Sequence, residues 1–178
     1  MTLELIALSL EDAISIAEDD MSFYAHVANA DAICELLGDV AAEQADLYEQ
    51  TEATAPWIGY LAYDTQANEI VGICSFKDMP EDAMTEIAFF TFPGYEARGY
   101  GGAMAAALVE IAWDSGEVDT VFAHTLREEN PSVRILRRLG FALVGPMDYP
   151  EDGPVWQWEL RQIPAENRWQ GRGDIERC

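Results

Sequence analysis

Residues 86–113 read EIAFFTFPGYEARGYGGAMAAALVEIAW, and the pattern changes twice along this stretch. The first part is mostly apolar and aromatic, which is typical of a β-strand. Glycines at positions 99, 101 and 102 follow, and the last part is dominated by the helix formers Ala, Leu and Met. Because the first amides of a helix have no internal acceptor and its macrodipole is positive there, this succession of strand, glycine turn and helix predicts an anion-binding loop.

Two well-known phosphate loops do not match this turn. A Walker loop requires a Lys and then a Ser or Thr after its last glycine, where this chain has Ala103 and Met104. The dinucleotide fingerprint requires a glycine in place of Met104 and an acidic residue about 20 residues further on, at the end of the next strand. Asp119 has roughly that spacing, but it precedes the next predicted strand.

A third phosphate loop fits. Arg98-x-x-Gly101-x-Ala103 matches the Arg/Gln-x-x-Gly-x-Gly/Ala signature of the GNAT superfamily of N-acetyltransferases. A second segment, NPSVRILRRLGF at residues 130–141, follows an apolar strand and resembles the corresponding segment of GNAT enzymes in the RimJ/RimL-like branch. Both segments occur in the order that this superfamily has, and the resemblance covers about residues 55–160.

The resemblance implies the GNAT fold, an α/β (α+β) architecture. Its mixed central sheet of about seven strands has helices on both faces, in the order β-α-α-β-β-β-α-β-α-β-β. The predicted strands are residues 3–8, 57–63, 69–76, 84–92, 120–126, 141–145 and 155–160. The predicted helices are residues 10–20, 30–50, 104–113 and 131–139, and residues 146–154 are predicted to be a loop. We expect residues 1–161 to form a single domain and residues 162–178 to be a polar, mobile tail.

The resemblance also implies an activity, the transfer of the acetyl group of acetyl-CoA directly to an amine. The acceptor is either a small-molecule amine or a protein N-terminus. In such enzymes the main-chain amides of the glycine loop surround the pyrophosphate, and the pantetheine arm lies along the strand before the loop. The residues that would contact coenzyme A are Ala88, Phe90, Phe92, Arg98, Gly99, Tyr100, Gly101, Gly102, Ala103, Met104, Asn130 and Arg137.

Three residues are candidates for proton transfer. Glu86 begins a segment that resembles the Glu-Ile-Gly-Tyr of RimJ/RimL-like enzymes, where the Glu acts as a base directly or through water. His124 is its rival, because an imidazole titrates nearest to neutral pH. Many GNAT enzymes carry a tyrosine as general acid where this chain has Leu136, and Ser132 is the suggested substitute.

The acceptor side is less well defined by the sequence. In GNAT folds the connection between the first two helices lines this side, so Phe23, Tyr24 and His26 are the predicted acceptor contacts. Leu136 also keeps a second function open, a non-catalytic module that binds or senses acyl-CoA. No local pattern names the acceptor.

The net charge of −23 excludes nucleic acid as a partner, because phosphate contacts require a basic surface. Two explanations of this charge remain, attraction of a cationic acceptor or a solvated acidic surface suited to high salt, and we favour the second. No apolar run is long enough for a membrane span, and no basic segment opens the chain, so we expect a cytoplasmic protein. Cysteine and histidine spacing predicts no metal site, and a homodimer is left open.

Overall fold

The computed structural model describes residues 2–149 and 153–163. They form one mixed sheet with the strand order β1-β2-β3-β4-β5-β7-β6, in which only β4 and β5 are parallel. The strands are β1 (Leu3–Leu8), β2 (Gly59–Asp64), β3 (Glu69–Phe76), β4 (Met84–Thr91), β5 (Thr120–Leu126), β6 (Ala142–Tyr149) and β7 (Gly153–Arg161). The helices are α1 (Leu10–Ala17), α2 (Ala30–Thr51), α3 (Tyr100–Asp114) and α4 (Pro131–Leu139), with a short 3-10 helix, η1 (Ser22–Tyr24), before α2. The predicted fold is therefore confirmed.

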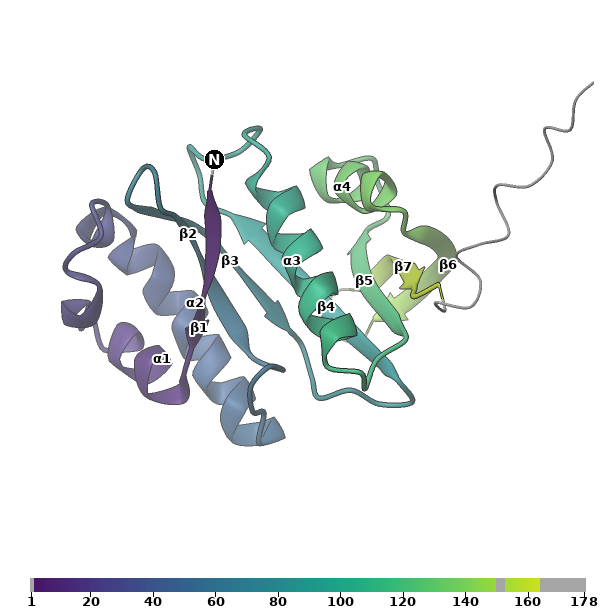
Figure 1. Cartoon of the computed structure of the whole chain (residues 1–178), viewed down its shortest axis with the longest axis horizontal. Coiled ribbons are helices and arrows are strands. Elements are labelled where there is room, and N and C mark those ends of the chain that lie inside the picture. Colours follow the sequence, from purple (N-terminus) through teal and green to yellow (C-terminus); the bar gives the residue numbers. More distant parts are fainter. Residues whose placement is uncertain (1, 150–152, 164–178) are drawn as a thin grey trace, which may run out of the picture.

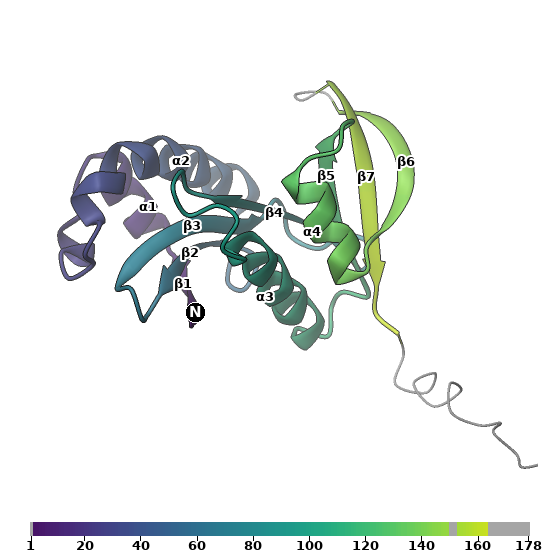
Figure 2. The same ribbon diagram turned by 90° about the horizontal axis from the view of Figure 1, so that it is seen from above.

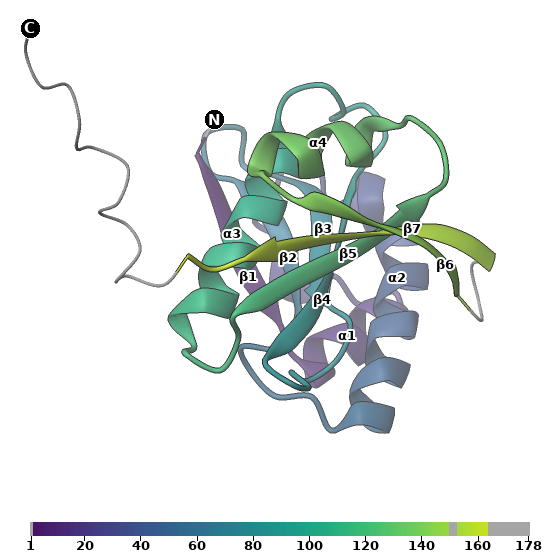
Figure 3. The ribbon, with the colours of Figure 1, turned by 90° about the vertical axis from the view of Figure 1, so that its right-hand side faces the viewer.

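The sheet separates two layers of helices (Figures 1 and 3). Helices α1 and α2 pack on one face of β1–β3, around a core that includes Leu37, Leu61 and Phe92. Helices α3 and α4 pack on the other face, around a larger core that includes Leu108 and Trp158. Figure 2 shows that the group β5–β7–β6 is turned away from the group β1–β4.

Several element bounds follow from local sequence signals. Ser9 caps α1 and forms a capping box with Asp12, as the spacing predicts. Asn130 caps α4 by accepting a hydrogen bond from the Val133 N–H, and Pro131 occupies the first helical position. Gly140, with φ of +92°, ends the same helix.

Two predicted strand boundaries were wrong, the end of β6 and the start of β2. Residues 146–149 belong to strand β6 rather than to a loop, and β2 begins at Gly59 rather than at residue 57. Pro146 is tolerated because β6 is an edge strand, where a missing N–H leaves no neighbouring strand unpaired. Residues 150–152 and almost all of the predicted tail at 162–178 lie outside the described residues.

Charge is distributed unevenly along the fold. None of the ten Lys and Arg residues precedes Lys77, so β1, α1, α2 and β2 carry acidic groups alone. On α2 the exposed residues Asp31, Glu35, Asp39 and Glu43 are each four positions apart. Like charges at this spacing lie side by side on a helix and destabilise it by roughly 0.2–0.5 kcal/mol per pair.

We expect the melting temperature to rise with KCl concentration, because salt screens this repulsion over about 10 Å at 0.1 M and about 3 Å at 1 M. The measurement is thermal unfolding at low and at molar KCl. A matched variant, Glu35→Gln with Glu43→Gln, should melt higher at low salt and respond less to KCl. A native chain that loses stability in molar KCl would contradict the idea that its acidic surface suits high salt.

Candidate active site

A wedge between β4 and β5 is the main opening in the sheet. The two parallel strands pair only through Met84–Thr120, Thr85–Val121 and Glu86–Phe122. Beyond these pairs β4 continues beside β3, and β5 continues beside β7. The strands therefore separate toward their carboxyl ends, and their facing main-chain groups have no strand between them.

Two helices begin at the open edge of this wedge. α3 follows the carboxyl end of β4, and α4 follows the carboxyl end of β5, so their amino ends lie at the same edge of the sheet. They also touch each other, because a Cβ added at Gly101 would lie 2.9 Å from Cδ1 of Ile135. Gly101 is thus needed for the packing of α3 against α4, in addition to its predicted role in binding phosphate.

The first turn of α3 has the free amides that the sequence predicts. The first intrahelical bond runs from the Ala103 N–H to the Gly99 carbonyl, and no side chain of the described residues caps this end. The N–H groups of Tyr100, Gly101 and Gly102 thus have no acceptor within the helix. Gly99 has φ of +93°, which favours glycine, and a Cβ placed at Gly102 would meet no atom outside its own stretch of helix within 4 Å. An anion can approach this backbone closely.

Buried side chains hold the loop in place. The Tyr100 hydroxyl donates to Oδ2 of the buried Asp64 at 2.6 Å, and Oδ1 of Asp64 accepts the N–H groups of Gln66 and Ala67. The hydrogen bond from Tyr100 lowers the pKa of Asp64 below its ordinary value, and the same bond raises the pKa of Tyr100. The side chain of Tyr100 therefore anchors α3 to the β2–β3 turn, and only its main chain is available to a ligand.

Arg98 is held by an aromatic ring. Its guanidinium lies 5.4 Å from the centroid of Tyr95, and the hydroxyl of Tyr95 accepts a hydrogen bond from Nδ2 of Asn29. Arg98 is exposed and lies next to the free amides, so it adds a positive charge at the mouth of the wedge.

Hydrogen bonding along β4 decides which residues face the wedge. The Lys77 N–H donates to the Glu86 carbonyl, and the Phe92 N–H donates to the Val71 carbonyl. Because main-chain groups alternate along a strand, the even-numbered residues of β4 turn their N–H and C=O toward β3. The predicted pantetheine contacts Ala88, Phe90 and Phe92 belong to this even-numbered set. The groups left for a ligand in the wedge are those of the odd-numbered residues Ile87, Phe89 and Thr91.

Glu86 and His124 meet where the wedge closes. Nδ1 of His124 lies 2.9 Å from Oε1 of Glu86, and the two side chains are 9% and 13% exposed. Glu86 pairs with Phe122, so His124, two residues further along β5, points to the same face of the sheet. The Phe122 ring packs edge-on against the imidazole at a centroid distance of 5.6 Å. The two predicted rivals for the role of base are therefore hydrogen-bonded partners.

The start of α4 supplies fewer free groups than the start of α3. Asn130 uses its Oδ1 as the helix cap, and Ser132 is half-buried in the first turn. Leu136 is fully buried in the core. Arg137 forms an ion pair with Glu129 at 2.7 Å, and its guanidinium lies 5.4 Å from the centroid of the Trp158 ring. These two contacts hold the guanidinium beside α4.

The predicted acceptor contacts lie elsewhere. Phe23 is exposed, Tyr24 is buried and His26 is exposed, and the carbonyl of His26 accepts a hydrogen bond from Asn68 in the β2–β3 turn. Burial raises the pKa of Tyr24 to about 12. Figure 2 shows this segment, which follows α1, at the end of the helical layer farthest from β5. The structure does not bring these three residues together with Glu86 and His124.

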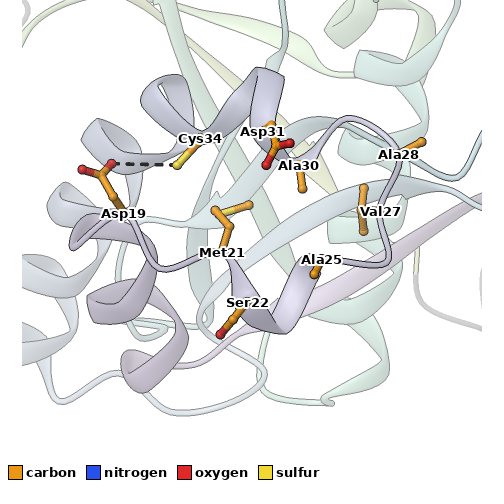
Figure 4. A pocket seen from close by; sticks show the side chains of 9 residues that line it. All are labelled: Asp19, Met21, Ser22, Ala25, Val27, Ala28, Ala30, Asp31 and Cys34. Atoms are coloured by element: carbon orange, nitrogen blue, oxygen red, sulfur yellow. Dashed lines mark hydrogen bonds between the residues drawn. The ribbon is translucent and has the colours of Figure 1, made fainter.

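A shallow hollow adjoins the same segment (Figure 4). Its volume is about 460 Å³, and it lies between the end of α1, η1 and the start of α2. Asp19 and Asp31 are on its wall, and the Cys34 thiol donates to Asp19 at 3.8 Å. No group of three or more metal-ligating side chains occurs among the described residues, here or elsewhere. Among all the residues that the structure describes, no helix is long and apolar enough to cross a membrane.

A family model for the acetyltransferase (GNAT) domain matches residues 2–142. The chain belongs to the GNAT acetyltransferase family. It is accordingly an acetyl-CoA-dependent N-acetyltransferase, and the wedge with the free amides of α3 fits acetyl-CoA as the co-substrate. A search of curated proteins finds no match to the sequence.

Solved GNAT structures share this fold. One is the acetyltransferase of Salmonella typhimurium that modifies the N-terminal serine of a ribosomal protein, with 16% identity, a TM-score of 0.63, and coverage of 92% of this chain and 96% of that one. Another is RimL in complex with coenzyme A, with 16% identity, a TM-score of 0.62, and coverage of 90% and 94%. The self-immunity acetyltransferase MccE, in complex with acetyl-CoA and AMP, has 15% identity, a TM-score of 0.61, and coverage of 90% and 92%.

Gly102 offers a direct test of the anion site. Gly102→Glu should raise the dissociation constant of acetyl-CoA roughly 10–100-fold, because a carboxylate a few ångströms from the pyrophosphate costs about 2–3 kcal/mol at an effective dielectric constant near 20. The fold should be retained, since the added side chain meets open space and an acid suits a helix start. Calorimetric titration of acetyl-CoA measures the effect. Gly102→Ala is the matched control and should bind much as the native chain does; equal affinity for all three proteins would contradict the assignment.

The Tyr100–Asp64 bond should stabilise the fold in a pH-dependent way. Tyr100→Phe should lower the free energy of unfolding by about 1–3 kcal/mol at neutral pH, because a buried carboxylate loses its donor. Since the pKa of Asp64 is lowered in the fold, this contribution is present above about pH 4, the ordinary range of Asp, and is lost as pH falls through the lowered pKa. The difference between native and variant proteins should therefore shrink in acid. Denaturant unfolding at neutral and acidic pH measures it.

Tyr63→Phe is the control for this experiment. Its hydroxyl donates to the neutral side-chain oxygen of Asn68 at 2.6 Å, so its contribution should not change between the two pH values. A Tyr100→Phe effect that is the same at both values would show that the charge of Asp64 is not involved.

Proposed function

We propose that this GNAT enzyme acetylates the free amine of a peptide or protein N-terminus, and that the amine reaches the wedge from the face that α1 and α2 partly cover. The observation that supports this is the Glu86–His124 pair at the closed end of the wedge, on the face opposite α3 and α4. Coenzyme A would occupy the open edge, beside the free amides of α3. Donor and acceptor then meet from opposite sides of the sheet.

The chemistry has a simple proton balance. The acceptor arrives as an ammonium and loses one proton to the Glu86–His124 pair, which requires a group of suitable basicity within hydrogen-bond reach. The amine nitrogen then attacks the thioester carbonyl, a C–N bond forms and the C–S bond breaks. The coenzyme A thiolate leaves with the second proton of the amine. Ser132 remains a predicted donor for this last transfer, from the first turn of α4.

Apolar side chains flank the pair on the acceptor face. Phe90 on β4 is 48% exposed and Leu126 on β5 is 56% exposed, and strand alternation turns them to the same side as Glu86 and His124. They stand on the two separating arms of the wedge. An N-terminal residue with an apolar side chain would cover them, which supports a peptide acceptor over a small polar amine.

The similar structures support the same acceptor class. RimL and the Salmonella typhimurium enzyme are acetyltransferases of a ribosomal protein. A peptide or protein N-terminus is accordingly the acceptor class that we propose for this chain.

One observation favours a second candidate function. Leu136 is fully buried where many GNAT enzymes have their acidic tyrosine, so a module that binds acetyl-CoA without turnover is the alternative. A panel of peptides with different N-terminal residues and of small amines, assayed for thiol release and by mass spectrometry, separates the two. Binding of acetyl-CoA without any transfer across the panel would favour the sensor.

Glu86→Gln tests the chemistry with the best acceptor from that panel. The kcat should fall roughly 10²–10⁴-fold, because the pair loses the negative charge that supports general-base catalysis, with little change in acetyl-CoA affinity. Glu159→Gln is the matched control, because Glu159 is on the same face, opposite Phe122, and is paired with Arg161 at 3.1 Å rather than with His124. Near-native turnover by Glu86→Gln would mean that the carboxylate takes no part in accepting the proton.

A further inference from the structure

We infer that Glu86 and His124 are not alternative bases but a single dyad, in which His124 accepts the proton of the acceptor amine and Glu86 positions and charge-stabilises the imidazole. This inference rests on the proposed function above and deepens it. It assigns the catalytic role to the residue on β5 and a positioning role to the residue on β4.

The hydrogen bond between the two side chains defines the tautomer. Glu86 in its ionised form is an acceptor only, so Nδ1 of His124 must donate across the distance of 2.9 Å. The lone pair of the neutral imidazole is then on Nε2. A carboxylate that holds Nδ1–H also stabilises the imidazolium that forms when Nε2 takes a proton, as in other carboxylate–histidine pairs.

The register of β4 and β5 places His124 beyond the last pair of the parallel ladder. Glu86 belongs to the last pair of the parallel ladder, opposite Phe122, where the wedge is closed. His124 lies two residues beyond that pair, in the part of β5 that has separated from β4. The imidazole therefore borders the separated part of the wedge, and the carboxylate holds it from the closed end.

Rigid elements hold both members of the dyad. The Glu86 carbonyl accepts the Lys77 N–H, and β5 is paired with β7 along its whole length, with His124 opposite Gln157. The edge-on contact with Phe122 limits rotation of the imidazole. The ion pair of Glu159 with Arg161 lies on β7, and the dyad is the one His–carboxylate pair among the described residues. Such fixed geometry is what a proton-transfer site requires.

The proton transfer is balanced within the dyad. The N–H bond of the acceptor ammonium breaks, an Nε2–H bond forms on His124, and Glu86 keeps its negative charge opposite the new imidazolium. The neutral amine then attacks the thioester as described above. The imidazolium returns its proton to solvent before the next turnover, so no oxidant, reductant or further reactant is needed.

Substitution of His124 distinguishes a proton-accepting role of this residue from a purely structural one. In His124→Asn the side-chain amide can occupy the place of Nδ1 and donate to Glu86, but it cannot accept a proton. We expect kcat to fall roughly 10²–10⁴-fold with acetyl-CoA affinity unchanged. In the double variant Glu86→Gln/His124→Asn the loss should barely exceed that of the worse single variant, because residues that act as a unit are not additive. Near-native kcat in His124→Asn, or losses that multiply in the double variant, would overturn the dyad.

A spectroscopic test measures the tautomer of His124 without any need for turnover. The chain has only two histidines, so nitrogen-15 NMR can assign both tautomers at about pH 8, where ordinary imidazoles are neutral. We expect His124 to be protonated at Nδ1 and to lose this preference in Glu86→Ala, while the exposed His26 stays the same in both proteins as an internal reference. Glu86→Gln, which retains an acceptor oxygen, should keep the tautomer. A native His124 protonated at Nε2 would overturn the inference even if the amine panel shows transfer, and the expected tautomer in a chain without transfer would instead refute the proposed function.

Discussion

The early end of the β4–β5 ladder is the constraint on which the rest of the site depends. Among the described residues only β4 and β5 are parallel; three residue pairs hold them together, and after Glu86 the strands part. A buried main-chain N–H or C=O needs a partner, so the wedge-facing groups of Ile87, Phe89 and Thr91 must bond to water or to a ligand. The opening therefore supplies ready hydrogen-bonding groups for an extended molecule such as the pantetheine arm.

The same opening would be of little use without a rigid loop beyond β4. Free amides at the start of α3 repel one another's dipoles and gain no helical bonds, so other contacts must hold their geometry. Tyr100 and Asp64 supply one such contact from the core, and Tyr95 with Asn29 supplies another. The side chains of the glycine loop thus anchor the structure, while its main chain stays available for an anion.

Local signals account for what could be predicted from the sequence. The bounds of β1, β3 and α4 are those predicted, because caps, turns and periodicity within each segment define them. The extent of β6 was missed, since its Pro146 is acceptable only at an edge that the sequence does not reveal. The sequence also did not predict the contact of Glu86 with His124, or that the odd-numbered residues of β4 turn their main-chain groups toward the wedge. Both depend on strand register between segments up to 38 residues apart, which no local pattern encodes.

The burial of Leu136 changes what the rest of the wedge must do. This position belongs to the core, so α4 cannot deliver a polar group from it to a leaving thiolate. An ammonium acceptor, however, carries both protons that the reaction moves, one removed before attack and one that leaves with the thiolate. The chain thus needs a base more than it needs an acid. In the proposed mechanism, a hydrogen-bonded imidazole and carboxylate, which the sheet itself holds in place, meet that need.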